Sequence, residues 1–266
     1  MAYTRIAPTP SGYLHLGNAY NFLLTSRLST RHGGQLLLRI DDIDRARYRE
    51  AYVQDVFDSL DWLGIDYQVG PNTIQEFESK WSQQLRIDRY QEILDELRAK
   101  NLVYPCAYSR REIQAMTTDG IYRGENRNSQ LSLDQAGVAW RVKVPKETSL
   151  ELTKKDSHID VDIHREMGDF VVRKKDGLPA YQIASLVDDV DHGIQLIVRG
   201  EDLIPSTAAQ LHLAECLDFL DFRRSVTFHH HPLILDAAGQ KLAKSQGAQS
   251  LKAMRESGFP PPEFAF

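Results

Sequence analysis

The strongest constraint on the fold is the order of apolar patterns in the first forty residues. A short strand is predicted at Thr4–Pro8, and the nearly continuous apolar run Gln35–Ile40 is typical of a strand buried on both faces of a parallel sheet. Between them, apolar residues recur at helical spacing from His15 to Arg31, and Gly33 and Gly34 are placed to end that helix. Two strands joined by a helix form a right-handed βαβ unit. We therefore predict an α/β protein with a parallel sheet flanked by helices.

The rest of the chain is predicted to continue this pattern around an insertion. Residues 104–165 are polar, and the strand candidates there, such as 138–144, are short. We therefore predict a nucleotide-binding core in two halves, 1–103 and 166–266, with an inserted subdomain at 104–165. The further helices and strands expected in the core cover residues 52–63, 81–100, 194–200, 206–219 and 230–236.

Composition narrows the class of protein. The chain has 266 residues, and no apolar run approaches the roughly 20 residues needed to cross a bilayer. No basic-then-apolar signal segment opens the sequence. Cys106 and Cys216 are far apart and form no CxxC pattern, so we expect no disulfide framework and predict a cytoplasmic protein. The net charge of −5 counts mildly against nucleic-acid binding, although a local basic patch can act alone.

The segment "APTPSGYLHLGN", residues 7–18, carries the first candidate site. A turn rich in proline and glycine follows the first predicted strand, and His15 and Gly17 lie at the start of the predicted helix. A helix N-terminus presents N–H groups and the positive end of the helix dipole, which suits a phosphate. His15 could donate to a triphosphate, and Gly17 has no side chain to block a nucleotide. Taken alone, a histidine at a helix start is more often structural.

The segment "KLAKS", Lys241–Ser245, carries the second candidate site. It lies in a polar loop that contains two glycines, and Lys241 and Lys244 are three positions apart. Two lysines on such a loop can place point charges over a triphosphate. Taken alone, the segment would be read as a solvated surface loop.

Together the two segments resemble signatures of the class I aminoacyl-tRNA synthetases. "HLGN" is similar to the HIGH signature and "KLAKS" to the KMSKS signature, and they occur in the expected order. The segments "RIAPTPSGYLHLGNA", "LLLRIDDIDRAR" and "GLPAYQIASLVDDVDHGIQLIVRGEDLIPSTAAQ" resemble the glutamyl subgroup, and the resemblance is weakest between about 66 and 165. The resemblance implies a Rossmann-type catalytic core that activates L-glutamate with ATP and transfers it to a tRNA.

The resemblance also implies which residues bind glutamate. Arg5 and Arg199 match arginines that grip its carboxylates, a task suited to a planar guanidinium, although taken alone they would be read as salt-bridged residues at strand ends. Tyr181 matches a tyrosine whose hydroxyl touches the amino acid. Asp41 stands where the subgroup usually has Glu, and it keeps an anion for the substrate ammonium. The glutaminyl branch also has Asp there, but "VRGED" at Val198–Asp202 follows the glutamyl pattern. The remaining positions implied for glutamate are Ile6, Ala7, Pro8 and Thr9.

The implied chemistry needs no protein nucleophile. The glutamate α-carboxylate attacks the α-phosphorus of ATP and pyrophosphate leaves, so catalysis consists of positioning and stabilisation of charge. His15, Lys241 and Lys244 are the expected donors, with Mg²⁺ on the departing pyrophosphate, and Gly17 leaves room for ATP. The mixed anhydride then acylates a hydroxyl of the RNA.

The identity of that hydroxyl depends on the subgroup. Only residues 246–266 follow "KLAKS", where ordinary glutamyl-tRNA synthetases carry a large anticodon-binding portion. The chain resembles the short glutamyl-Q tRNA(Asp) synthetases, which attach glutamate to the queuosine base of the tRNA(Asp) anticodon, and Phe170–Tyr181 follows their pattern. We therefore predict a monomer that acts on the anticodon loop of tRNA(Asp). The alternatives are a catalytic fragment of a glutamyl-tRNA synthetase that charges tRNA(Glu), and a non-catalytic paralogue that binds glutamate, ATP or RNA, which the intact motifs disfavour.

Zinc is expected to be absent, in contrast to many members of that subgroup. They often bind the metal through a C-x-C pair and a later Y-x-x-x-C, and the corresponding residues here are Cys106, Tyr108, Tyr122 and Asn126. One cysteine does not make a tetrahedral zinc site, which needs thiolates or imidazoles at most positions. We predict that the inserted subdomain is instead held by packing of Tyr104, Tyr108 and Tyr122.

Two further groups of residues have weaker functional interpretations. His229, His230 and His231 follow one another on a predicted strand, so alternate side chains point to opposite faces and are not expected to converge on a metal. Several basic residues could contact RNA phosphates or could simply be solvated; these are Arg110, Arg111, Arg123, Arg127, Lys174 and Lys175.

Overall fold

The computed structural model describes residues 3–154, 157–234 and 250–266. The chain divides into two compact units. Unit 1 comprises Met1–Leu85, His192–Asp202 and Val226–Phe266, and unit 2 comprises Arg86–Asp191 and Leu203–Ser225. Within the described residues, no helix combines the length and the apolar character needed to cross a membrane.

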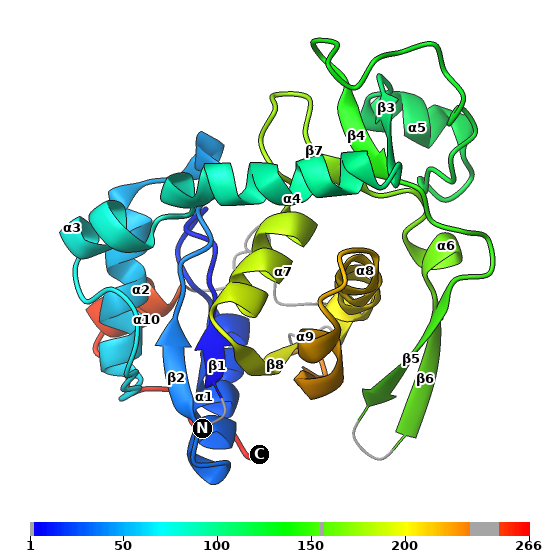
Figure 1. Cartoon of the computed structure of the whole chain (residues 1–266). Helices are drawn as coiled ribbons and strands as arrows, with labels where there is room; N and C mark the ends of the chain where they lie inside the picture. Colours follow the sequence, from blue (N-terminus) through cyan, green and yellow to red (C-terminus); the bar gives the residue numbers. More distant parts are fainter. Residues whose placement is uncertain (1–2, 155–156, 235–249) are drawn as a thin grey trace. The chain divides into compact units, whose positions relative to one another are not determined.

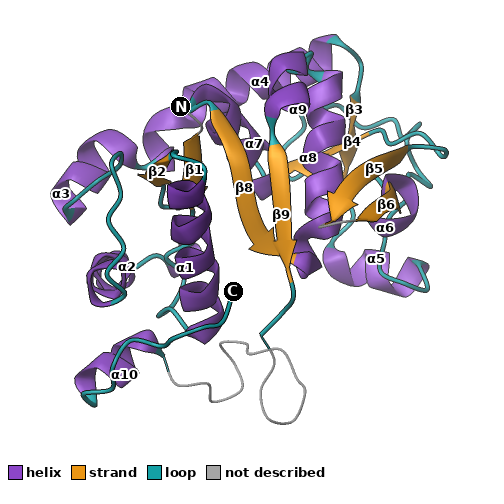
Figure 2. Ribbon diagram, turned by 90° about the horizontal axis from the view of Figure 1, so that it is seen from below, coloured by secondary structure: helices purple, strands orange, loops and turns teal. Residues whose placement is uncertain are grey.

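Unit 1 is built on a four-stranded sheet with the strand order β2–β1–β8–β9, in which every neighbouring pair is parallel. Tyr3 lies opposite Gln35 in the pairing of β1 with β2, and Arg199 lies opposite His230 in the pairing of β8 with β9. Helix α1 packs against β1, β2 and β8 (Figures 1 and 2), so the predicted α/β class and the first βαβ unit are confirmed. The elements of unit 1 are β1 (Tyr3–Ile6), α1 (Leu16–Arg31), β2 (Gln35–Leu38), α2 (Glu50–Trp62), α3 (Ile74–Glu76), β8 (Ile194–Gly200), β9 (Thr227–His231) and α10 (Leu251–Glu256).

Both ends of α1 are set by local sequence, as predicted. His15 is the N-cap: its ring accepts a hydrogen bond from the helix, while the Asn18 side chain accepts the His15 N–H, which completes a capping box. At the other end Gly33 adopts a φ of 61°, a left-handed conformation that glycine adopts without strain. The N–H of Gly34 then donates to the carbonyl of Ser29 at 2.9 Å, the hydrogen bond of a Schellman motif.

Two elements, one in each unit, differ from the prediction. The last strand was expected at residues 230–236, of which 235 and 236 lie outside the described residues; β9 spans Thr227–His231. Pro232 has no N–H to donate to a sheet, which explains why the strand ends there. The helix expected at 81–100 is interrupted at Ser82, which has an extended backbone and whose hydroxyl donates to buried Asp42 at 2.7 Å. A 3-10 turn over Gln83–Arg86 follows, and the α-helix α4 begins at Ile87.

Unit 2 contains two antiparallel sheets and the helices packed on them. One sheet has the order β3–β4–β7, and the other is the hairpin β5–β6. Helix α4 packs on β3, α7 on β7, and α8 on β5 and β6, so segments outside 104–165 join that region in one unit. The division into 1–103, 104–165 and 166–266 stays a prediction. The elements of unit 2 are α4 (Ile87–Ala99), β3 (Val103–Cys106), α5 (Arg110–Met116), β4 (Ala139–Val142), β5 (Ser149–Lys154), β6 (Ser157–Asp162), α6 (Ile163–Glu166), β7 (Val171–Arg173), α7 (Tyr181–Asp191), α8 (Ile204–Cys216) and α9 (Leu220–Ser225).

Candidate functional site

Three of the residues predicted to bind glutamate lie where the parallel strands of unit 1 end. Arg5 is the next-to-last residue of β1 and Arg199 the next-to-last residue of β8, and both are buried, with 5% and 4% of their surface exposed. Asp41 follows the end of β2 by three residues and is also buried. In an open parallel sheet the carboxyl ends of the strands share one edge, and ligands bind in the crevice outside it.

The loops that leave β1 and β2 are joined by main-chain hydrogen bonds. The Arg39 N–H donates to the carbonyl of Ile6, and the Asp41 N–H donates to the carbonyl of Pro8, both at 2.9 Å. Ala7 and Thr9 flank Pro8 on the same loop. The segment Ile6–Thr9 therefore runs beside Asp41, as expected if both face one small ligand.

Arg39 is a functional candidate that the sequence reasoning missed. Its Nε donates to Asp41 Oδ1 at 2.6 Å and its Nη2 to Asp41 Oδ2 at 3.1 Å, with the two side chains 3% and 6% exposed. The carboxylate expected to bind the substrate ammonium is thus oriented by a buried guanidinium. The signal was the spacing: residues two apart in extended chain point to the same face.

A second buried carboxylate fixes the chain just beyond this pair. Asp42 is fully buried; Ser82 Oγ donates to its Oδ2 and the Gln83 N–H to its Oδ1, both at 2.7 Å. Arg45 lies 2.6 Å from Asp42 Oδ2 and also pairs with Glu78 at 2.9 Å. Burial raises the pKa of Asp42, although Ser82, Gln83 and Arg45 all act to lower it. These contacts hold the segment after β2 in place.

The start of α1 brings His15 and Gly17 into contact through a capping box. His15 Nδ1 accepts the Gly17 N–H at 3.1 Å, so in the neutral ring the proton is carried by Nε2, which becomes a donor. The His15 N–H in turn donates to Asn18 Oδ1 at 3.0 Å. A Cβ atom on Gly17 would lie 3.1 Å from both Nδ1 and Cε1 of His15, so glycine leaves room for this ring.

The other predicted site residues divide into three cases. The Arg199 guanidinium lies 4.9 Å from the centre of the Phe228 ring in β9, a cation–π contact within unit 1. Tyr181 belongs to unit 2, where it is the first residue of α7 and is 40% exposed. Lys241 and Lys244, with the whole "KLAKS" segment, lie outside the described residues.

Three of the four residues at the expected zinc positions are joined by hydrogen bonds and ring contact in unit 2. The Tyr108 and Tyr122 ring centres are 5.8 Å apart; the Asn126 N–H donates to Tyr122 Oη at 3.0 Å and its Nδ2 to Tyr108 Oη at 3.3 Å. Cys106 is buried beside them. One thiol among two phenols and an amide does not fit zinc. In the described ranges no three His, Cys, Asp or Glu residues are grouped so as to hold a metal, and His229–His231 are no exception.

Two of the basic residues considered for RNA contact are engaged inside the protein. Arg127 pairs with Asp169, which is completely buried, through bonds of 2.6 and 2.5 Å. Arg123 donates to Asp119 at 2.6 Å and to the carbonyl of Arg165 at 2.7 Å. Arg110 and Arg111 are exposed at the start of α5, Lys174 pairs with Asp176 at 3.2 Å, and Lys175 donates to the carbonyl of Ala107.

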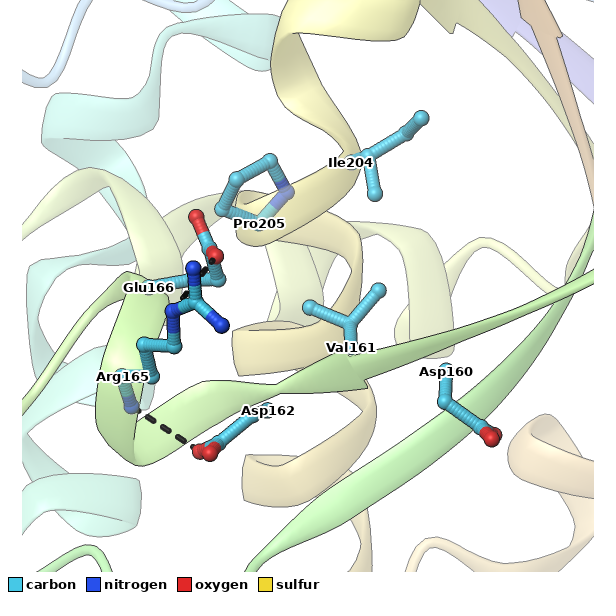
Figure 3. A pocket seen from close by; sticks show the side chains of 7 residues that line it. All are labelled: Asp160, Val161, Asp162, Arg165, Glu166, Ile204 and Pro205. Carbon is cyan, nitrogen blue, oxygen red and sulfur yellow. Dashed lines mark hydrogen bonds and ion pairs between the residues drawn. The ribbon is translucent and has the colours of Figure 1, made fainter.

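A separate cavity of about 260 Å³ lies in unit 2 (Figure 3) and contains none of the predicted site residues. Three carboxylates and one guanidinium contribute to it: the Arg165 N–H donates to Asp162 at 2.9 Å, and its side chain lies 3.9 Å from Glu166. This excess of negative charge is unsuited to ATP or glutamate. The lining residues are Asp160, Val161, Asp162, Arg165, Glu166, Ile204 and Pro205.

Comparisons with known proteins address the family to which the chain belongs. The family model of tRNA synthetases class I (E and Q), catalytic domain, matches residues 1–265. The glutamate–tRNA ligase of Nitrosomonas europaea is 34% identical over 98% of this chain, which spans 55% of that protein. The glutamyl-Q tRNA(Asp) synthetase of Nitratidesulfovibrio vulgaris is 33% identical over 96% of this chain and 82% of that protein.

Solved structures give the same result for the fold. The crystal structure of the glutamate–tRNA synthetase from Elizabethkingia anophelis superposes with a TM-score of 0.74 at 25% identity, over 97% of this chain and 54% of that one. A glutamate tRNA ligase from Elizabethkingia meningosepticum gives a TM-score of 0.73 at 24% identity over 100% of this chain and 55% of that one. Family match, relatives and fold therefore agree that the chain belongs to the class I tRNA synthetase catalytic domains of the glutamate and glutamine group.

Proposed function

We propose that this chain activates L-glutamate with ATP, forming glutamyl-adenylate, and transfers the glutamyl group to a tRNA. The observation that supports this most is the edge of the unit 1 sheet. There, two buried arginines and a buried carboxylate occupy the strand ends, matching the two carboxylates and the ammonium of glutamate. The chain spans little more than half the length of several relatives it matches, so their activity is a proposal for this protein.

The adenylation step assigns a role to each group. A glutamate α-carboxylate oxygen bonds to the α-phosphorus of ATP, and the bond to the pyrophosphate oxygen breaks. His15, as an Nε2 donor at the positive end of α1, stabilises the phosphate charge. Mg²⁺ that accompanies ATP supplies further positive charge for the pyrophosphate. Lys241 and Lys244 are proposed as additional donors from the resemblance of their segment alone.

The amino acid is tested by ATP–pyrophosphate exchange. We expect exchange that requires glutamate and is weak with aspartate, because Arg5, Arg199 and Asp41 together match its charges. Arg199→Ala should leave a substrate carboxylate unpaired and cost about 3 kcal/mol of transition-state binding, the upper value for a hydrogen bond to a charged group. Lys244→Ala should lower the exchange rate far more than the apparent glutamate affinity. Equal exchange with glutamine would overturn the assignment to glutamate.

For the acceptor, we propose the queuosine base in the anticodon loop of tRNA(Asp). The support is the segment Phe170–Tyr181, which resembles the glutamyl-Q pattern, together with 33% identity to a glutamyl-Q tRNA(Asp) synthetase. In the structure this segment forms β7, a tight turn and the start of α7. The turn is closed by Lys174 N–H donating to the carbonyl of Leu178 at 2.8 Å, and Gly177 adopts a φ of 89°.

An isolated anticodon stem-loop separates the two acceptors. If queuosine is the acceptor, a stem-loop that carries it should be glutamylated about as well as whole tRNA(Asp), and a stem-loop without queuosine should not react. Glutamylation of tRNA(Glu) that requires its intact 3′ end, with none of the stem-loop, would instead identify a glutamate–tRNA ligase activity. Salt dependence cannot separate the two, because phosphate contacts weaken with salt for any RNA.

A further inference from the structure

A cluster of contacts joins the carboxyl-terminal helix α10 to the chain directly before α1. The Leu251 N–H donates to the carbonyl of Leu14 at 2.8 Å, and Ser250 forms an isolated antiparallel bridge with His15. Ser250 also caps α10, because its hydroxyl accepts the Ala253 N–H at 3.1 Å. Two segments more than 230 residues apart in sequence are therefore paired through their main chains at the nucleotide-binding motif.

One buried carboxylate, that of Asp55, bonds to both segments. Asp55 in α2 is 2% exposed, and its Oδ2 accepts the Leu14 N–H at 2.9 Å. Its Oδ1 accepts Arg255 Nη2, also at 2.9 Å, while Arg255 Nη1 donates to Ser59 Oγ at 2.7 Å. α10 packs against α2, as Figures 1 and 2 both show. Asp55 thus binds the residue before His15 with one oxygen and α10 with the other.

Neighbouring residues add further contacts to this arrangement. Leu251 is completely buried and belongs to the same apolar core as Leu14. Lys252 lies 4.7 Å from the centre of the Tyr13 ring, and that ring meets Tyr52 of α2 edge-on at 5.1 Å. The segment that enters α1 is therefore fixed between α2 and α10 by apolar, ionic and main-chain contacts together.

We propose that Asp55 and Arg255 are positioning residues for the adenylation step, acting through Leu14 on His15. The inference rests on the proposed function, in which His15 Nε2 donates to a phosphate. The His15 ring is already constrained by Gly17, and its N–H by Asn18, so its direction follows the main chain at Leu14. A displacement of about 1 Å at a reacting group can cost roughly 100-fold in rate, so a small shift at Leu14 is enough to matter.

A graded set of variants tests the proposal by ATP–pyrophosphate exchange and by calorimetric titration with ATP. Asp55→Ala removes both bonds, and Asp55→Asn keeps an oxygen for the Leu14 N–H. Arg255→Ala keeps the Asp55 bond to Leu14 but removes the ion pair with Asp55, the hydrogen bond to Ser59 at 2.7 Å and the contact with Asp58 at 3.7 Å. We expect kcat to fall by roughly 30-fold, 5-fold and 10-fold respectively, with the glutamate KM changed by less than about 2-fold. ATP affinity should weaken in the same order, and Arg255→Lys should recover most of the loss from Arg255→Ala.

Arg127→Ala is the matched control, because it breaks an ion pair within unit 2 whose carboxylate, Asp169, is as buried as that of Asp55. It should lower the melting temperature as much as Arg255→Ala while leaving kcat unchanged. If the Asp55 and Arg255 variants likewise lose only stability, their role is structural and the proposal is wrong. If the wild-type protein shows no glutamate-dependent exchange, the proposed function fails, whereas a graded loss of ATP affinity would still support positioning. A wild-type protein that does not bind ATP would overturn both.

Discussion

The buried pair of Arg39 with Asp41 allows a quantitative test of the candidate glutamate site. The pair makes two hydrogen bonds, 2.6 and 3.1 Å long, between side chains that are 3% and 6% exposed. Removing one partner of such a pair leaves a buried, unpaired charge and lowers the free energy of unfolding by about 3–5 kcal/mol. For a chain of this size that loss corresponds to a fall of about 6–20 °C in melting temperature. Arg39→Ala should therefore be strongly destabilised.

Arg98→Ala is the matched control for burial. Arg98 makes an equally regular pair with Asp134, with two bonds of 2.7 Å, but these side chains are 43% and 65% exposed. Water screens an exposed pair, so its loss should leave the free energy of unfolding within measurement error. The assay is denaturant unfolding of both variants beside the wild type. If Arg39→Ala loses no more stability than Arg98→Ala, the burial argument is wrong.

Activity then separates the role of Arg39 in stability from its role in orienting Asp41. Arg39→Lys keeps the charge but cannot make the bidentate pair, so the glutamate KM in exchange should rise about 10-fold while kcat largely holds. Replacing both partners, with Arg39→Met and Asp41→Leu, should recover much of the stability, because buried ion pairs can be replaced by apolar residues of similar size. The double variant should nevertheless be inactive, since the ammonium has lost its carboxylate. Full activity in the double variant would exclude Asp41 from the glutamate site.

Three further predictions follow from single positions. Gly17→Ala should lower the exchange rate about 10-fold, because the added Cβ would lie 3.1 Å from the His15 ring. The melting temperature should hold or rise, since alanine favours a helix by about 1 kcal/mol over glycine. An unchanged exchange rate would contradict this. Burial raises the pKa of Tyr122 to about 12. The neutral phenol therefore contributes stability that is present below pH 10 and is lost as the pH rises through 12. Tyr122→Phe should reduce this loss of unfolding free energy, measured by urea titration at pH 8 and pH 11. The purified protein should contain no zinc by elemental analysis, and stoichiometric zinc that disappears in Cys106→Ser would refute the prediction.

The sequence alone determined the elements whose causes are local. The helix predicted from His15 to Arg31 appears as α1, because its caps are made by residues within a few positions of each end. The apolar run of residues 35–40 likewise predicted strand β2, and the order strand, helix, strand predicted the parallel sheet. The same local patterns predicted His15 and Gly17 at the start of this helix, whereas Arg5 and Arg199 were singled out by family resemblance; both are next to last in their strands, β1 and β8.

Tertiary structure decided what depends on residues distant in sequence. The helix expected over 81–100 is interrupted at Ser82 because this residue bonds to buried Asp42, 40 positions away; a 3-10 turn over Gln83–Arg86 then leads into α4. Arg255 and Asp55 are 200 positions apart, so no periodicity relates them. Such contacts form only when folding buries charged groups away from water, where they pair with one another. The physical reason is that hydrogen bonds and ion pairs depend on distance in space, whereas sequence patterns record only distance along the chain.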